Sequence, residues 1–357
     1  MSVSCSKLDL ADSRGCRNAD FVINGKSMCG NEGLLRSPMH VGRTLNAMLY
    51  TVGPTRSAPN VRCNVVCGAC GKLGVPPSRS AFLPGSLRGT LLDRILGGKE
   101  VDYPGKYPWM AKLTVILTLQ NNSEVVTDEC GATLINDRYL LTAAHCFWLP
   151  PIEYKSERVM VTLGEHDTST TAEAVTLVQE LLPTNVLIHP QFNEKAFDDN
   201  DMALVKLNTP VDWQASPNIR PICLPGSAPP GVGLTGTIVG WGTTAAWSAD
   251  ATVPTTSKVV REAEVKTWSL DECKSALVNE TLTENMFCAS GTAAIGVCWG
   301  DGGGPLMIPK GNDVFEQAGI ISFGPKGCQE ILLPSIYAQV SNYLSFIKDS
   351  TPDAVWC

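Results

Sequence analysis

Short apolar runs separated by polar turns recur through the chain after residue 94. Near the C-terminus, Tyr343, Phe346 and Ile347 share one face at helical spacing and predict a closing helix. The pattern predicts an all-β unit over residues 95–357 that ends in this helix. The apolar runs are of strand length and cover residues 113–119, 159–163, 203–207, 237–239 and 317–321.

The chain before residue 95 has a different pattern. Residues 1–62 hold short alternating runs that are typical of strands, together with Cys5, Cys16 and Cys29. Residues 63–94 hold three further cysteines and are rich in Gly, Pro and Ser between positions 71 and 89, which predicts an exposed and flexible linker. Three regions are therefore expected, with boundaries after residues 62 and 94.

Composition narrows the class of protein. Charged residues make up 18% of the 357 residues, the net charge is −7 and no basic run stands out, so a nucleic-acid partner is not expected. The 32 glycines and 24 prolines suit a β protein with many turns. No apolar stretch reaches the length of about 18 residues that a transmembrane helix needs, and no membrane span is expected.

Fourteen cysteines predict disulfide bonds and an oxidising compartment. The first residues, Met1-Ser2-Val3-Ser4-Cys5, do not resemble the apolar core of a signal peptide. We therefore expect a secreted, extracellular protein whose sequence here begins inside a longer precursor or represents the mature form.

Four short motifs carry chemistry. Two of them are Thr142-Ala143-Ala144-His145-Cys146 and Asp201-Met202-Ala203-Leu204, and the others are Arg94-Ile95-Leu96-Gly97-Gly98 and Cys298-Trp299-Gly300-Asp301-Gly302-Gly303-Gly304-Pro305. They resemble the histidine, aspartate, activation and nucleophile segments of chymotrypsin- and trypsin-like serine proteases, in that family's order along the chain. The resemblance covers roughly residues 95–350 and implies two six-stranded antiparallel β-barrels with a cleft between them.

The resemblance assigns a role to each position of the cleft. His145 would be the general base, and Asp201 would hold the imidazole in its working tautomer. Gly302 stands where the family has its nucleophilic serine, and glycine has no side chain that can attack a carbonyl. The backbone N–H groups of Gly300 and Gly302 would still form an oxyanion hole. Asp198 and Asp199 lack the Asp201 context and are interpreted as loop residues.

The same family also implies an activation step and a specificity pocket. Cleavage after Arg94 by an upstream trypsin-like protease would free the ammonium of Ile95, which would pair with Asp301. Ser322 would pair with the backbone of a bound peptide. The residues that would form the pocket carry no charge, so a neutral or apolar side chain is expected rather than Arg or Lys; these positions are Gly296 at the floor with Gly324 and Ser335 at the walls.

The resemblance also implies disulfide pairs. Cys223 occupies the tethering position, with Cys67 or Cys70 as its partner, and Cys357 would take the other of the two. Connectivity cannot be derived from the sequence alone. The implied pairs within the protease-like region are Cys130 with Cys146, Cys273 with Cys288, and Cys298 with Cys328. Those of the N-terminal region are Cys16 with Cys29 and Cys5 with Cys63.

Residues 1–62 resemble part of a CUB domain, a module that precedes the protease domain in several secreted arthropod proteases. The likeness rests on the segment from Cys16 to Gly25, on Met28-Cys29-Gly30 and on the apolar run at residues 45–50. The alternative is an unclassified propeptide held by cysteines.

Two weaker signals concern modification and metal binding. Asn121 and Asn279 each begin an N-glycosylation sequon. Glu165 and Glu173 bracket a loop that binds calcium in some relatives, although its length differs here and a solvated acidic loop is the simpler interpretation. No other metal or cofactor is expected.

Three hypotheses for function follow. In the first, the chain is an inactive serine protease homologue that binds protein or peptide ligands as a cofactor or decoy in an extracellular proteolytic or innate-immune cascade. In the second, it is an active endopeptidase whose serine codon was changed by engineering or by a sequence error. A purely structural role is the third.

Overall fold

The computed structural model divides the chain into two compact units, one formed mainly by residues 1–69 and the other mainly by residues 70–356. Each unit is described by itself. The residues that the structure describes are 2–9, 19–23, 26–28, 39–40, 47–51, 60–66, 70–75, 98–119, 125–148, 154–170, 176–212, 215–243, 256–291, 296–325, 328 and 333–356.

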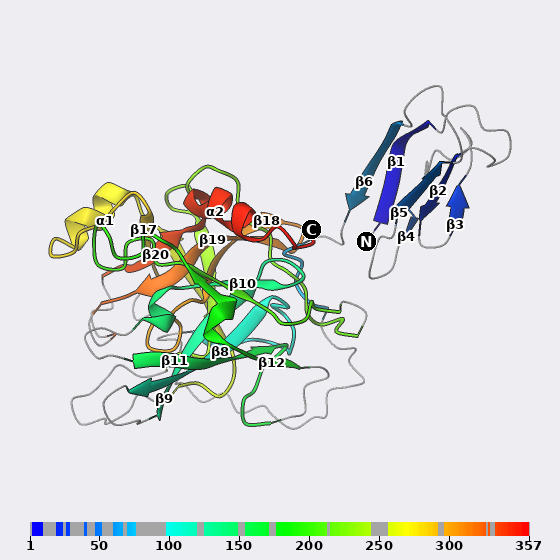
Figure 1. The fold of residues 1–357 in the computed structure, drawn as a ribbon. Coiled ribbons are helices and arrows are strands. Elements are labelled where there is room, and N and C mark those ends of the chain that lie inside the picture. Colours follow the sequence, from blue (N-terminus) through cyan, green and yellow to red (C-terminus); the bar gives the residue numbers. More distant parts are fainter. Residues whose placement is uncertain are drawn as a thin grey trace. The chain divides into compact units, whose positions relative to one another are not determined.

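The first unit contains two small antiparallel sheets, drawn in blue in Figure 1. One sheet has the strand order β4-β1-β6 and the other the order β3-β2-β5. In the first sheet, Cys5 of β1 lies directly opposite Cys63 of β6. The strands are β1 (Ser2–Asp9), β2 (Ala19–Ile23), β3 (Lys26–Met28), β4 (Met39–His40), β5 (Ala47–Thr51) and β6 (Asn60–Val66).

The first half of the second unit is one curled antiparallel sheet with the order β12-β11-β8-β9-β10-β14-β13. Its turns include two 3-10 helices, η3 (His145–Phe147) and η4 (Pro183–Asn185). The strands are β8 (Met110–Leu119), β9 (Val125–Leu134), β10 (Tyr139–Thr142), β11 (Tyr154–Leu163), β12 (Leu177–Leu181), β13 (Val186–Ile188) and β14 (Ala203–Lys206).

The second half is a barrel that closes through the pairing of β15 with β16. Its order is β15-β18-β19-β20-β17-β16, with the short strand β7 added beside β16. The strands are β7 (Lys99–Glu100), β15 (Thr235–Gly240), β16 (Arg261–Thr267), β17 (Met286–Ser290), β18 (Pro305–Gly311), β19 (Val314–Phe323) and β20 (Ser335–Gln339). The all-β prediction is confirmed, with one closed barrel of six strands and one curled half-barrel.

Alternation along the strands builds the two cores. In β8, Ala111, Leu113, Val115 and Leu117 are buried, while the residues between them are partly exposed. This period of two places one face of the strand inside the half-barrel. In the closed barrel, a cluster that includes Ile238, Leu306 and Tyr337 fills the interior. All five apolar runs of the sequence lie on strands of these two sheets, apart from Leu207 at the end of one run.

Two short α-helices complete the second unit. The predicted closing helix is α2 (Leu344–Ser350), which follows the 3-10 helix η6 (Val340–Tyr343). Of the three residues predicted to share its face, Tyr343 and Ile347 are buried and Phe346 is partly buried. The other helix, α1 (Leu270–Ala276), begins with a capping box in which Ser269 and Glu272 satisfy each other's backbone N–H groups. Among the described helices, none has the length and apolar character needed to cross a membrane.

Disulfide bonds cross-link the second unit. The structure joins Cys130 to Cys146, Cys273 to Cys288 and Cys298 to Cys328, which are the pairs that the resemblance implies. It also joins Cys223 to Cys70, which resolves the choice between Cys67 and Cys70. Cys67 and Cys357 lie outside the described residues, and so do Cys16 and Cys29.

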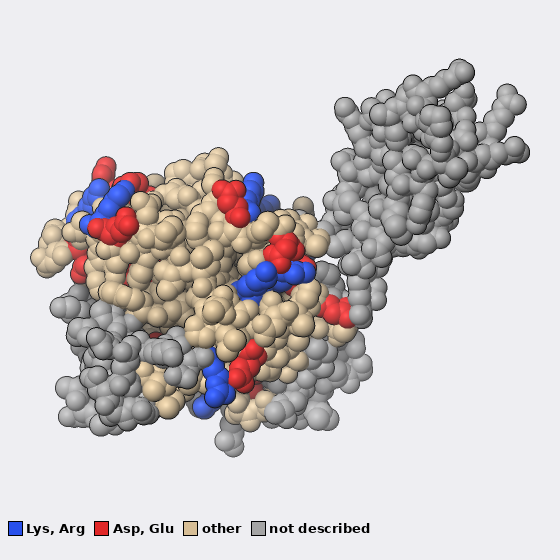
Figure 2. All heavy atoms as spheres, in the orientation of Figure 1, with Lys and Arg blue, Asp and Glu red and all other residues tan. Residues whose placement is uncertain are grey.

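Charge is mixed on the surface. Figure 2 shows basic and acidic side chains in small interspersed groups on the described part of the face that it draws. Typical pairs are Arg158 with Glu180 and Arg138 with Asp353, both at 3.1 Å. This arrangement agrees with the low charge content of the sequence and offers no continuous basic surface on the part of this face that is described.

The disulfide between Cys70 and Cys223 joins a segment before the predicted activation site at Arg94 to a segment after it. This can be tested directly. Trypsin cleavage after Arg94 is expected to yield two fragments that stay together on a non-reducing gel and separate once reductant is added. A Cys70→Ser/Cys223→Ser/Cys357→Ser triple variant is the control, because it also removes the implied pair of Cys67 with Cys357, and its fragments should separate without reductant. If they stay joined, another cysteine pair provides the tether and the assignment is wrong.

Candidate active site

Strand register brings His145 and Asp201 together. Strands β10 and β14 pair so that Thr142 lies opposite Ala203. His145 begins η3 just after β10, and Asp201 lies two residues before β14. Two residues that are distant in sequence therefore reach the same point at the edge of the sheet.

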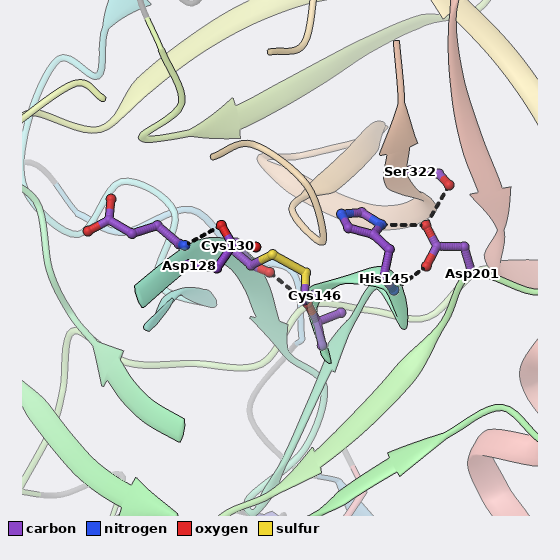
Figure 3. The surroundings of a disulfide bond; sticks show 9 residues. Asp128, Cys130, His145, Cys146, Asp201 and Ser322 are labelled. Atoms are coloured by element: carbon purple, nitrogen blue, oxygen red, sulfur yellow. Dashed lines mark hydrogen bonds and ion pairs between the residues drawn. A yellow bond between two sulfur atoms is a disulfide. The ribbon is translucent and has the colours of Figure 1, made fainter. Parts of the chain in front are cut away.

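The carboxylate of Asp201 accepts three hydrogen bonds (Figure 3). The backbone N–H of His145 donates to Oδ1 at 2.9 Å, the Nδ1 atom of His145 lies 2.7 Å from Oδ2, and the hydroxyl of Ser322 donates to Oδ2 at 2.5 Å. Asp201 is fully buried, whereas the imidazole is 27% exposed. Ser322 belongs to β19 of the closed barrel, so this carboxylate joins both halves of the second unit.

The pair shifts the pKa of both partners. Burial alone would lower the pKa of His145, but the charge and hydrogen bond of Asp201, assisted by Asp198 and Asp128, raise it to about 9. Burial would raise the pKa of Asp201, but the imidazolium charge and the three hydrogen bonds hold it below its ordinary value. Each partner therefore favours the charged form of the other, and Asp201 fixes the orientation of the ring through Nδ1.

Gly302 faces the other ring nitrogen of His145. A Cβ atom built on Gly302 would lie 2.5 Å from Nε2 and 3.0 Å from Cε1 of this imidazole. The imidazole therefore leans into the space that a nucleophile's side chain would occupy. The structure brings the three predicted positions together, and a side chain at 302 requires the ring to move by several tenths of an ångström.

The loop around Gly302 is held by its backbone. The N–H of Gly131 donates to the carbonyl of Gly302 at 2.8 Å, and the N–H of Gly303 donates to Ile321 at 2.9 Å. Gly303 has φ +78°, and a Cβ there would lie 2.2 Å from the hydroxyl oxygen of Thr142, so only glycine fits. Among the described residues, no acceptor meets the N–H of Gly300 or Gly302, the two predicted oxyanion donors.

Asp301 is buried at the base of this loop. Its carboxylate accepts from the N–H of Gly242 at 2.9 Å and from the N–H of Cys298 at 3.0 Å. Within the described part of the chain, no cation pairs with it. Burial therefore raises the pKa of Asp301 to about 6, although the two N–H donors act in the opposite direction. Arg94 and Ile95 lie outside the described residues, so the predicted pairing of Ile95 with Asp301 stays a prediction.

The predicted pocket positions lie close together. The hydroxyl oxygen of Ser335 is 3.9 Å from a Cβ built on Gly296 and 3.4 Å from one built on Gly324. Ser335 is itself buried. The three residues that the sequence assigns to one pocket therefore meet, and none of them carries a charge.

The interpretation of Asp198 and Asp199 as loop residues was incomplete. Both lie in the turn before Asp201, but Asp198 is only 6% exposed and Asp199 is fully buried. The pKa of Asp198 is raised to about 7 by burial and by the charge of Asp201, which the charge of His145 partly offsets. The sequence signal that could have revealed this group is the run of acidic and amide side chains at residues 198–201, directly before an apolar strand.

The remaining predicted sites are less informative. Asn279 is exposed in the turn after α1, where a glycan is sterically accessible. Glu165 accepts a hydrogen bond from the backbone N–H of His166. Asn121 and Glu173 lie outside the described residues, so the glycosylation site at Asn121 and the calcium-binding loop stay predictions.

The fold, with one closed barrel and one curled half-barrel, and the site, with an oriented imidazole facing a residue that has no side chain, are those of a protein of the serine protease type. A profile of the trypsin family matches residues 95–347. The chain belongs to the trypsin family.

Three insect proteins are among the relatives. Melanization protease 1 of Drosophila melanogaster is 32% identical over 72% of this chain and 66% of that protein. Spaetzle-processing enzyme of the same species is 32% identical, with the same two coverages. Phenoloxidase-activating enzyme 1 of Spodoptera litura is 28% identical over 91% of this chain and 83% of that protein. The chain thus spans about two thirds of the length of the two fly proteins.

The description of Asp301 as a buried carboxylate without a cation can be tested through the pH dependence of the free energy of unfolding. Because the folded, uncleaved chain binds this proton more tightly than the unfolded chain does, folding loses stability as pH rises from about 4 through about 6. A pKa rise from 3.8 to about 6 corresponds to about 3 kcal/mol at most. The free energy of unfolding of the natural chain minus that of Asp301→Asn should therefore fall by up to this amount between pH 4 and pH 7.

Urea unfolding of both single-chain proteins across this range measures the difference. The Asp301→Asn variant also places a side-chain amide against two backbone N–H donors. This cost to its stability does not change with pH, so it does not affect the pH dependence of the difference. A difference that stays flat with pH would contradict the description of Asp301 as a buried carboxylate that lacks a cation.

Proposed function

We propose that the protein is a catalytically inactive homologue of the trypsin-family proteases. The observation that carries this proposal is Gly302, which leaves the imidazole of His145 without a nucleophile to activate. In related triads, removal of the nucleophile alone costs about a millionfold in the rate of peptide hydrolysis. Ser322 does not replace it, since its hydroxyl is buried and bonded to Asp201.

The proposed activity is binding. The N–H groups of Gly300 and Gly302, which meet no acceptor among the described residues, support the capture of a peptide carbonyl. The uncharged positions Gly296 and Ser335 favour a neutral or apolar side chain beside it. The names of the relatives refer to melanization, phenoloxidase activation and Spaetzle processing. We therefore propose a role as cofactor or decoy for a protein partner in an extracellular proteolytic or innate-immune cascade.

Activation and location form part of the same proposal. An upstream trypsin-like protease would cut after Arg94, and the Ile95 ammonium would then meet the carboxylate of Asp301. Four disulfides in the second unit suit a secreted protein. The antiparallel strands of the first unit are consistent with a partial CUB-like module, and glycans are proposed at Asn121 and Asn279. No cofactor is proposed for this function.

The second candidate is an active endopeptidase with neutral or apolar specificity, whose serine codon was altered. The observation that favours it is what remains of the site, because Asp201 still orients the ring of His145 through Nδ1 and the carboxylate of Asp301 is still buried. Resequencing the source transcript at codon 302 separates the two candidates.

Covalent labelling tests the absence of a nucleophile. A fluorophosphonate probe should leave the natural protein unlabelled after cleavage at Arg94. A Gly302→Ser variant should acquire one label per chain, once its new side chain displaces the imidazole from the space beside it. Gly302→Ala is the matched control, because it adds the same Cβ without a hydroxyl and should remain unlabelled.

Mass spectrometry of the intact chains decides the outcome. Stoichiometric labelling of the natural protein would overturn the proposal of inactivity. An unlabelled Gly302→Ser variant that retains its fold would show instead that the cleft has lost more than its nucleophile.

A further inference from the structure

The turn before Asp201 places a second buried carboxylate beside the imidazole. One ring nitrogen of His145, one carboxylate oxygen of Asp198 and one of Asp201 lie within 4.8 Å of one another. The turn bends inward because Asn193, Asp198 and Asn200 all adopt left-handed backbone conformations, which Asn and Asp tolerate best among residues with side chains. The side chain of Asn193 secures this geometry by accepting from the N–H of Asp198 at 2.6 Å.

The carboxylate of Asp198 has no partner in the described part of the chain. Its neighbour Asp199 shows the contrast, since it accepts hydrogen bonds from the side chains of Thr283, Asn285 and Asn200. Asp198 is more than nine-tenths buried but receives no hydrogen bond and forms no ion pair among these residues. A buried carboxylate without a partner is costly, so this position favours a cation.

The imidazole of His145 has the orientation that a metal-binding histidine needs. Its Nδ1 atom is held by Asp201 at 2.7 Å, and histidine ligands of metals usually direct their second nitrogen to a carboxylate in this way. With glycine at position 302, no side-chain hydroxyl among the described residues is bonded to Nε2, so an ion can bind this nitrogen once it displaces the ring proton. The imidazole is 27% exposed, which gives an ion access from solvent.

We propose that His145 and Asp198 bind a divalent transition-metal ion, with Asp201 orienting the imidazole. An imidazole nitrogen and a carboxylate oxygen are both ligand types that Zn²⁺ takes, and water would complete its coordination. The ion would compensate the two adjacent buried carboxylates and would occupy the nitrogen that a general base uses. This site is independent of the proposed partner and of the cascade, so it is tested on the isolated protein.

The absent side chain at position 302 is part of the site. A Cβ at this position would lie 2.5 Å from Nε2, so any side chain there competes with an ion for the same nitrogen. In this protein, the substitution that removes the nucleophile therefore also frees a metal ligand.

Calorimetric titration of the full chain with ZnCl₂ tests the proposal. The natural protein should bind one equivalent that Asp198→Asn binds at least tenfold more weakly, while Asp198→Asn without metal should melt no lower than the natural protein. Asp128→Asn is the matched control. Asp128 adds negative charge near His145 but lies outside the cluster, so its loss should change the affinity much less. Gly302→Ser should also weaken binding.

Co²⁺ in place of Zn²⁺ provides an independent readout, because imidazole coordination generates a visible absorption band that His145→Gln should abolish. Equal Zn²⁺ affinity in the natural protein and Asp198→Asn would overturn the proposal. So would equal losses in Asp198→Asn and Asp128→Asn, which would indicate general electrostatic attraction. Unchanged affinity in Gly302→Ser would place the ion away from Nε2 and would also overturn it.

Discussion

The buried carboxylate of Asp201 is the constraint on which the cleft depends. It takes hydrogen bonds from both the backbone and the ring of His145 and from Ser322 of the other barrel. A fully buried carboxylate is tolerated only when donors and a positive charge surround it, and here the imidazolium supplies that charge. The orientation of the imidazole, its approach to Gly302 and its proximity to Asp198 all follow from this one group.

Asp301 presents the opposite situation. It is as deeply buried as Asp201 but has only two backbone N–H donors and no cation among the described residues. The glycines around it make this possible, since a Cβ at Gly240 or Gly242 would lie 2.3 Å from its carboxylate group. The molecule thus holds one buried carboxylate that the imidazole of His145 compensates and one for which the described residues supply no cation.

Much of this arrangement could be predicted from the sequence. The apolar runs located the strands, and the helical spacing of Tyr343 and Ile347 located the last helix. Three features could not be predicted. Spacing alone does not distinguish Cys67 from Cys70, because both lie in the same linker. The half-barrel depends on pairings between strands that are distant in sequence, and local patterns of apolar residues do not predict such pairings. Asp198 is charged and lies in a turn, which predicts exposure, yet it is buried in a turn with left-handed backbone at Asn193, Asp198 and Asn200.

The central claim is that the pair of His145 and Asp201 is fully formed without a nucleophile. Proton NMR of the protein labelled with ¹⁵N-histidine measures this directly, because the proton on Nδ1 in a short, charge-assisted hydrogen bond resonates far downfield. The account predicts one such signal at neutral pH, which is lost in Asp201→Asn but retained in Asp199→Asn. Absence of the signal from the natural protein, or its survival in Asp201→Asn, would contradict the account.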